Sequence, residues 1–410
     1  MKLKKLLLVL AVISVCGASI TAKAKNAYQV SVMEEFKPDS KNKKLGYQFI
    51  ENGNKVVFVF DAAAYGIERP EYVFVEGSFN GWKKKDPNYQ LAEAGKKLFI
   101  LIVETGDIMV PGNSGYPEFK FICKFQKPYD EYICGQKVVR YKTEEAELNA
   151  LKSFPGYQMA TNNLILRPED DANYVIENLR IAEKVKKLKD FNLDNPEDVA
   201  TISNFRQVPG TTKLFRGYHP YKKSRMQFDT EETRVQLVNK QLKDNGVKSI
   251  ITLSGEEALD KKESMSVYVT DIRTQGNWLF VNTHYNVVYY KSTSKEFGEL
   301  MAEIIKFIGS HPGPYYVHCR LGTDRTGVIS ATLAALCGAS WDEIAADYQK
   351  TNNMGIKEFR DYKLLQYSFE KILGHPIAET EDLQKEFIDY FTGRNFVTKA
   401  DVDALIANLK

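Results

Sequence analysis

The sequence has few cysteines, histidines and tryptophans, no long apolar run and almost no net charge. Its 410 residues include five Cys, five His and three Trp. The histidines include no pair at the spacing of metal ligands, which gives metal-dependent hydrolysis little support. No segment reaches the ~20 continuous apolar residues of a membrane-spanning helix. A formal charge of +3 does not indicate nucleic acid as a partner, because binding to a phosphate backbone needs a basic surface.

Apolar and aromatic residues are plentiful. Hydrophobic residues make up 43% of the chain, which contains 23 Tyr and 23 Phe. This composition supplies enough apolar surface for packed cores and excludes collagen-like, low-complexity and wholly disordered chains. At ~100–200 residues per domain, the length allows two or three domains.

Residues 1–24 have the pattern of an export signal. Three lysines within the first five residues precede the apolar run 6–15, and small residues end at Ala24. The apolar run is too short to span a hydrocarbon core of ~30 Å. We therefore expect cleavage after Ala24 and a mature protein that is periplasmic or secreted. A lipid anchor through Cys16 is the less favoured alternative.

Residues 45–167 contain β-branched and aromatic runs separated by Gly, Pro, Asn and Asp. The runs cover residues 55–60, 72–76, 98–103 and 119–125. Strands at this spacing, with no helical period between them, predict an all-β, immunoglobulin-like antiparallel sandwich. Within it, Cys123 and Cys134 either form a local disulfide or are two buried thiols.

Residues 200–375 follow a different pattern, in which short apolar strands alternate with helices. Residues 248–253 predict a buried strand, and residues 295–308 place apolar side chains on one helical face. This alternation predicts a three-layer α/β domain with a mainly parallel central sheet. The charged residues 168–199 form a linker, and residues 376–410 predict a helical extension.

The stretch 315–327 joins a strand, a loop that contains glycine, and a mostly apolar helix. It reads Tyr-Tyr-Val-His-Cys-Arg-Leu-Gly-Thr-Asp-Arg-Thr-Gly, so that the strand ends at Cys319 and the helix begins near Arg325. In this context backbone N–H groups and the positive end of the helix form a cradle for a phosphate dianion, without metal or cofactor. Arg325 can bind two phosphate oxygens through its planar fork.

Cys319 is the predicted nucleophile. A thiolate at a helix N-terminus beside a guanidinium is stabilised, which lowers the pKa of the thiol. The thiolate can attack a bound phosphorus and form an intermediate that water later cleaves. Gly322 lets the loop bend, and Thr326 can donate a hydrogen bond to the sulfur. The cradle is predicted to comprise Arg320, Leu321, Gly322, Thr323 and Thr326, supported by His318 and Gly327.

These residues match the His-Cys-(five residues)-Arg-Thr-Gly signature of the cysteine-dependent protein tyrosine phosphatase superfamily, which the chain resembles. Residues 204–206 and 214–220 resemble the opening of the dual-specificity-like and atypical bacterial members. The resemblance covers about 200–375 and implies a phosphoric monoester hydrolase that works through a cysteinyl-phosphate intermediate. An inactive phosphate- or glycan-binding protein is the alternative from another class.

The reaction also needs a proton donor for the leaving group. In much of the superfamily this donor is an Asp on a mobile loop, but the corresponding residues 287–296 contain none. Asp324 is the predicted general acid, because some members of the superfamily place an Asp there. Glu296 and Asp271 are alternatives, and Asp324 as a simple helix cap is the structural alternative.

Cations gather in the sequence well before the cradle. Residues 210–228 contain no acid and carry five cations, which are Lys213, Arg216, Lys222, Lys223 and Arg225. Together with Arg320, these cations favour a polyanionic substrate such as a phosphoinositide or inositol polyphosphate, with Arg216, Lys222 and Lys223 as a rim. A phosphotyrosine peptide is equally permitted, and a solvated basic face is the structural alternative.

Residues 73–82, 118–122 and 162–166 resemble the glycogen-binding early-set modules. The resemblance implies a sugar site lined by Trp82, Lys120 and either Asn162 or Asn163. Its pairing with a phosphatase-like domain resembles the glucan phosphatases, so a phosphorylated polysaccharide is a third substrate option. A purely structural sandwich is the alternative.

Overall fold

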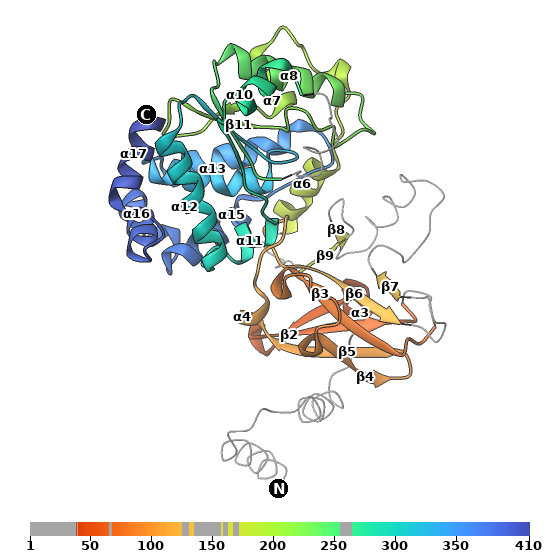
Figure 1. The fold of residues 1–410 in the computed structure, drawn as a ribbon. Helices are drawn as coiled ribbons and strands as arrows, with labels where there is room; N and C mark the ends of the chain where they lie inside the picture. The colour runs from red at the N-terminus through yellow and green to blue at the C-terminus, as the bar shows by residue number, and fades with distance from the viewer. Residues whose placement is uncertain are drawn as a thin grey trace. The chain divides into compact units, whose positions relative to one another are not determined.

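The computed structural model describes most of the chain, in several stretches. These are residue 38 and residues 40–64, 68–124, 131–134, 157–158, 163–166, 172–254 and 265–410. The predicted export signal, Cys16 and Asn162 lie outside the described residues. The chain divides into two compact units (Figure 1). One comprises Met1–Ile108 and Phe119–Tyr157, and the other comprises Met109–Glu118 and Gln158–Lys410.

The first unit is built on an antiparallel sheet. Its strands are β1 (Tyr47–Ile50), β2 (Lys55–Asp61), β3 (Tyr72–Gly77), β4 (Gln90–Gly95), β5 (Leu98–Glu104), β6 (Glu118–Lys124) and β7 (Glu131–Cys134). They pair in the order β1-β2-β5-β4-β3-β6, with β7 beside β6. Two short helices, α3 (Ser40–Leu45) and α4 (Thr105–Ile108), contact β2 and β5 respectively.

The sheet is curled, since aromatic rings of strands that are distant in the pairing order pack together. The rings of Phe58 in β2 and Phe119 in β6 lie 5.1 Å apart, and those of Phe60 and Phe121 lie 5.2 Å apart. The pairings of β1 to β6 form one continuous path, and an immunoglobulin-like sandwich stays a prediction. Cys123 is buried, but the side chain of Cys134 lies outside the described part of the chain, so the disulfide also stays a prediction.

The second unit contains a five-stranded sheet in the order β10-β11-β14-β12-β13. Its strands are β10 (Arg206–Gln207), β11 (Leu214–Gly217), β12 (Ser249–Thr252), β13 (Trp278–Phe280) and β14 (Tyr315–His318). The strands β11, β14, β12 and β13 run parallel, and β10 is antiparallel to β11. The short strands β8 (Tyr157–Gln158) and β9 (Asn163–Ile165) precede them in sequence.

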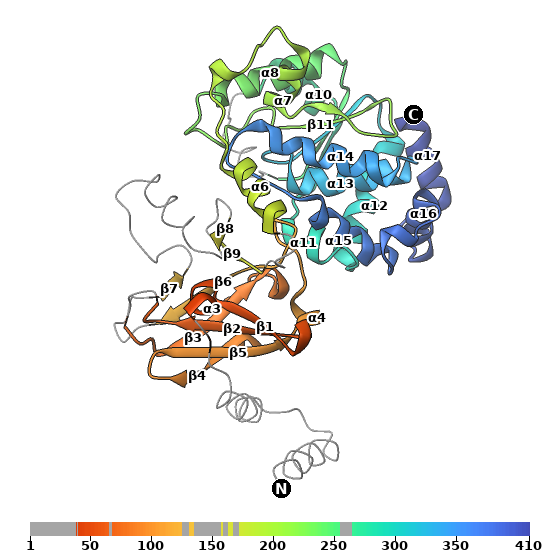
Figure 2. The ribbon, with the colours of Figure 1, turned by 180° about the vertical axis from the view of Figure 1, so that it is seen from behind.

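Helices surround this sheet (Figure 2). They are α6 (Ala172–Glu183), α7 (Pro196–Ser203), α8 (Glu231–Asp244), α10 (Val267–Thr274), α11 (Tyr285–Tyr290), α12 (Lys295–Ser310), α13 (Asp324–Leu336), α14 (Trp341–Lys350), α15 (Tyr362–Leu373), α16 (Leu383–Gly393) and α17 (Lys399–Leu409). Among the helices in the described stretches, none is long and apolar enough to cross a membrane.

Successive side chains of β12 and β14 enter two different cores, because neighbouring residues of a strand point to opposite faces of the sheet. Ile250 and Tyr316 belong to a core that includes side chains of α8 and α10. Ile251 and Val317 belong to a core that includes side chains of α12 and α13. The sheet therefore has a helical layer on each face, and its central strand β14 is completely buried.

The second unit also includes three segments outside the range 200–375, which are residues 109–118, 158–199 and 376–410. In the C-terminal extension, Phe387, Phe391 and Leu405 are completely buried in the core that contains α12 and α13. In the segment that precedes β6 in sequence, Tyr116 packs in a small cluster with Phe359. Ala182, from residues 158–199, belongs to the same cluster as Tyr116. All three segments contribute apolar side chains to the unit, so each is a structural part of it.

Candidate active site

The loop after β14 has a backbone shape that requires glycine at one position. Cys319 follows the strand directly, and α13 begins at Asp324. Gly322 has φ of +75°, and a Cβ at this position would lie 2.2 Å from the backbone oxygen of Gly217. Any other residue would clash with the neighbouring strand β11, so Gly322 allows the loop to turn tightly against it.

Three consecutive carbonyls of the loop accept hydrogen bonds from groups outside it. The backbone N–H of His219 donates to the oxygen of Arg320 at 3.3 Å. The Asn204 side chain donates to the oxygen of Leu321 at 2.9 Å, and Arg216 donates to that of Gly322 at 2.7 Å. In a trans peptide the N–H points away from the carbonyl, so the N–H groups that follow face the opposite side of the loop. This is the arrangement of an anion cradle.

Arg216 is therefore a support of the loop, and its predicted place in a substrate rim is wrong. Its side chain is completely buried. Besides Gly322 it binds Asp347, with 2.8 Å between Nη1 of Arg216 and Oδ2 of Asp347. Asp347 also pairs with Arg206, with 2.5 Å between Oδ1 and Nε. Burial opposes ionisation of Asp347, but the two guanidinium charges outweigh it and lower the pKa of the carboxyl.

We expect Asp347→Asn to destabilise the fold strongly. The change leaves the buried guanidinium of Arg216 and the partly buried one of Arg206 without a carboxylate. Breaking a buried pair in this way costs about 3–5 kcal/mol of unfolding free energy. Urea unfolding measures the loss. Asp389→Asn is the matched control, because it removes an exposed ion pair with Lys385 and should leave stability nearly unchanged. Equal stability of the two variants would contradict a structural role for Asp347.

His318 is held as a neutral side chain that fixes the backbone of Cys319. Trp278 donates to the Thr252 hydroxyl at 2.8 Å, and this hydroxyl lies 2.8 Å from Nε2 of His318. Nδ1 lies 3.2 Å from the backbone oxygen of Cys319, so the ring proton belongs on Nδ1. Burial lowers the pKa of His318 to about 4, and the ring brings no charge to the site near neutral pH.

The Cys319 thiol is free and only 3% exposed. Burial by itself raises its pKa, but the Arg325 charge and the hydroxyl and backbone N–H of Thr326 lower it, and the net pKa lies below that of an ordinary thiol. Burial raises the pKa of Cys337 to about 11, against the lowering effect of the Lys410 charge. The pKa of Cys319 is therefore lowered, as a nucleophilic thiol requires, whereas the pKa of Cys337 is raised.

One hydrogen-bond donor of the loop and one of Arg325 are available to a ligand. Nη1 of Arg325 donates to the backbone oxygen of Thr283 at 3.1 Å. Nε of Arg325 and the Thr323 hydroxyl are buried and have no hydrogen-bond partner in the described part of the chain. A buried donor without a partner costs about 1–3 kcal/mol, so these groups favour binding of an oxyanion.

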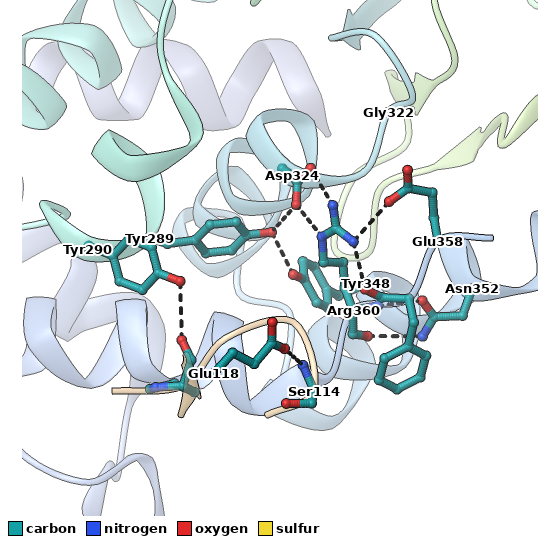
Figure 3. A network of polar contacts seen from close by, with 12 residues as sticks. Ser114, Glu118, Tyr289, Tyr290, Gly322, Asp324, Tyr348, Asn352, Glu358 and Arg360 are labelled. Carbon is teal, nitrogen blue, oxygen red and sulfur yellow. Dashed lines mark hydrogen bonds and ion pairs between the residues drawn. The ribbon is translucent and has the colours of Figure 1, made fainter. Parts of the chain in front are cut away.

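Asp324 is engaged in a network that keeps it ionised (Figure 3). Its two oxygens accept hydrogen bonds from Arg360 at 2.5 and 3.0 Å, and the Tyr289 hydroxyl donates to it at 3.0 Å. Burial raises the pKa of Asp324, but the Arg360 charge and these hydrogen bonds outweigh it, so the net pKa is lowered. The contacts favour the ionised carboxylate, whereas a proton donor must begin protonated. Its role as general acid stays a prediction.

The two alternative acids lie on other helices. Asp271 is an exposed residue of α10, and Glu296 is an exposed residue in the first turn of α12. Within the described residues, neither has a hydrogen bond or ion pair with a cradle residue. Their roles also stay predictions.

The rim residues Lys222 and Lys223 and the other cations Arg225 and Arg320 differ in how their charges are neutralised. Lys223 pairs with Glu232, and Arg225 pairs with Glu358. Lys222 and Arg320 have no ion pair in the described stretches, and Arg320 is exposed. Both charges act on the buried ring of His219, whose pKa is lowered well below the ordinary value mainly by burial. Lys222 and Arg320 can therefore offer their charges to a ligand.

The predicted sugar-site residues lie in different environments. Nζ of Lys120 lies 5.2 Å from the ring centre of Trp82 and 3.6 Å from Glu76, so these side chains do meet. Asn163 is buried and donates to Glu118 at 2.8 Å. Its prediction as a surface ligand is therefore wrong, because a buried amide bound to a carboxylate is not available to a sugar.

Comparison with known proteins gives one family. Residues 189–409, more than half of the chain, match the tyrosine phosphatase family. The chain belongs to this family. It is a phosphoric monoester hydrolase, and that prediction is confirmed. The matched range extends beyond the predicted 200–375 and includes α16 and α17.

Among solved structures, this phosphatase is similar to the core catalytic domain of the PP-IP phosphatase SIW14 from S. cerevisiae, in complex with citrate. The identity is 14% and the TM-score is 0.27, and the match covers 47% of this chain and 94% of that chain. No curated protein matches the chain.

Sequence reasoning missed several residues that hold the site. Asp347 is 131 residues from Arg216, and Arg360 is 36 residues from Asp324. No local pattern joins such partners. The available signal was the acidic residue Asp347 within the helix α14. Which face of α14 is buried is not defined until the helix packs, so the sequence alone does not identify the partner of this acid.

Proposed function

We propose that this phosphatase hydrolyses phosphate monoesters through a covalent intermediate on Cys319. The observation that carries the proposal is the loop whose carbonyls of Arg320, Leu321 and Gly322 are all held from outside. Its N–H groups are then directed at the phosphate oxygens, together with the guanidinium of Arg325. The lowered pKa of Cys319 supports a thiolate at the same place.

In the first step the thiolate of Cys319 attacks phosphorus. The S–P bond forms, the P–O bond to the leaving group breaks, and the leaving oxygen takes up a proton. In the second step water attacks the cysteinyl phosphate and gives up a proton, the S–P bond breaks, and the thiolate is restored. Arg325 and the loop N–H groups stabilise the charge on the transferring phosphoryl group in both steps.

The substrate we propose carries more than one phosphate, as a phosphoinositide or an inositol polyphosphate does. Support comes from Lys222 and Arg320, whose charges are not balanced by an ion pair within the described residues. A second phosphate beside the cradle would supply that balance. Phosphopeptides and phosphorylated glucans are the other outcomes of the test.

Phosphate release, measured side by side on a phosphopeptide, a phosphoinositide, an inositol polyphosphate and a phosphoglucan, tests this function. We expect Lys222→Glu to lower kcat/KM for the polyphosphorylated substrates by about tenfold, the loss of one charge-assisted contact. A simple aryl monophosphate should be affected much less.

Lys223→Glu is the matched control, because Lys223 already pairs with Glu232. It should not change the ranking of the four substrates. Equal losses on the monophosphate and the polyphosphates would contradict a selective rim, and release from none of the substrates would contradict the function itself.

We also propose that the enzyme acts outside the cytoplasm, on the pattern of residues 1–24. The N-terminal domain is proposed to resemble the early-set modules, and the contact between Trp82 and Lys120 supports a polar and aromatic face there.

A further inference from the structure

Arg360, in the segment between α14 and α15, binds the first residue of α13 with two nitrogens of its guanidinium (Figure 3). Its Nε and Nη2 atoms donate to the two oxygens of Asp324 at 2.5 and 3.0 Å. Both side chains are largely buried. A bidentate pair of this kind fixes the direction of the two groups as well as their distance. Both oxygens of the Asp324 carboxylate are therefore engaged by Arg360.

Arg360 is itself held on several sides. Its backbone N–H donates to the Asn352 side chain at 2.8 Å, and the Asn352 amide donates to the backbone oxygen of Arg360 at 2.9 Å. Nη1 of Arg360 donates to the backbone oxygen of Phe359 at 2.7 Å and to the Glu358 carboxylate at 3.1 Å. The guanidinium therefore has a set position, and this position determines where the Asp324 carboxylate lies.

Two tyrosines join the same carboxylate to the next turn of α13. The Tyr289 hydroxyl donates to Asp324 at 3.0 Å and lies 2.6 Å from the Tyr348 hydroxyl. Tyr348 packs against Gly327, where a Cβ would lie 2.9 Å from the tyrosine ring. The network thus contacts α13 at residues 324 and 327, on either side of Arg325 in sequence.

The Asp324 carboxylate opposes the effect of Arg325 on the nucleophile. Burial and the Asp324 charge raise the pKa of Cys319, whereas the Arg325 charge lowers it. The buried phenol of Tyr316 also interacts with Cys319, but burial raises its pKa well above the ordinary value, so it stays neutral. Among the residues that the structure describes, no ion pair joins Asp324 to Arg325, and Nε of Arg325 has no hydrogen-bond partner.

We propose that Arg360 is a positioning residue for the cradle, a role that rests on the proposed attack by Cys319. Arg360 acts through Asp324, because it binds both carboxylate oxygens and keeps them from the guanidinium of Arg325. Arg325 then binds the phosphate and stabilises the thiolate. Without Arg360, the carboxylate would turn to Arg325, the other cation that interacts with it, and would compete with the phosphate.

Arg360→Gln tests this role, because it removes the charge and the planar fork and leaves a polar side chain. We expect the pH midpoint for alkylation of Cys319 by iodoacetate to rise by about one pH unit, the scale of one nearby charge. The affinity for inorganic phosphate should fall by about tenfold, the loss of one charge-assisted contact. Mass spectrometry of the peptide that contains Cys319 and calorimetric titration measure the two effects. Arg360→Lys keeps the charge and should shift both in the same direction by smaller amounts.

A double variant separates a positioning role from a structural one. Asp324→Asn combined with Arg360→Gln removes the carboxylate through which Arg360 acts, so the alkylation midpoint and the phosphate affinity should both return close to the wild-type values. Arg69→Gln is the matched control. Arg69 binds both oxygens of Glu93 in the same bidentate way on the exposed surface of the first unit, so its loss should change neither property.

Lower stability of Arg360→Gln with an unchanged midpoint and an unchanged affinity would overturn the proposal, because a purely structural role predicts that result. A shift that persists in the double variant would also overturn it, because Arg360 would then not act through Asp324. Alkylation and phosphate binding need no turnover, so these results are separate from the proposed function, which full activity of Cys319→Ser would contradict.

Discussion

Cys319→Ser should reduce turnover of an aryl phosphate by a factor on the order of 10⁴–10⁶, the scale seen when an enzyme loses its nucleophile. The serine hydroxyl stays protonated at neutral pH, whereas the pKa of Cys319 is lowered by Arg325 and Thr326 against the effect of burial. The cradle itself is unchanged, so the variant should still bind inorganic phosphate. Steady-state kinetics and calorimetric titration with phosphate measure the two properties.

Cys337→Ala is the matched control for this result. Cys337 is another buried free thiol, but burial raises its pKa to about 11. Its loss should leave kcat unchanged, and iodoacetate near neutral pH should inactivate this variant as fast as the wild type. Inactivation that disappears with Cys337, or turnover retained in Cys319→Ser, would contradict the nucleophilic role of Cys319.

Arg325→Ala should lower kcat/KM for aryl phosphates by a factor on the order of 10³–10⁵, the scale of an arginine that stabilises a transferring phosphoryl group. The guanidinium supplies two parallel donors for the phosphate and also the largest favourable charge beside the Cys319 thiolate. Both contributions are lost together. Kinetics on para-nitrophenyl phosphate and the rate of alkylation of Cys319 report them separately.

Arg325→Lys separates charge from geometry. Lysine keeps the positive charge but not the planar fork, so we expect alkylation of Cys319 to stay fast while most of the catalytic loss remains. Arg180→Ala removes an exposed arginine paired with Glu177 on α6 and serves as the control. Wild-type kinetics in Arg325→Lys would show that a point charge suffices and that the fork has no role.

The parts of the site that lie together in sequence were predicted from sequence. Cys319, Gly322 and Arg325 stand within seven residues, between a strand and a helix that each have a strong apolar pattern. Local backbone geometry then dictates where their groups point, so the cradle could be recognised before any packing was known.

The environment of each charge could not be predicted in this way. Arg216 and Lys222 both belong to one basic stretch of sequence, yet Arg216 is completely buried against Asp347 and Lys222 is partly exposed. Asp324 is predicted from sequence as a carboxyl group beside the cradle, yet Arg360 binds both its oxygens. Whether a charge is paired depends on partners tens of residues away.

By itself the sequence determined the order of strand, loop and helix, the cysteine proposed as the nucleophile, and the residue that lets the loop turn, because these depend on neighbours along the chain. Tertiary structure alone decided which carbonyls of the loop accept hydrogen bonds from outside it, that Arg360 binds both oxygens of Asp324, and that Arg325 contacts Thr283. Those outcomes depend on packing of β11, β13 and α14 around the loop, and contact between elements distant in sequence carries no local signature.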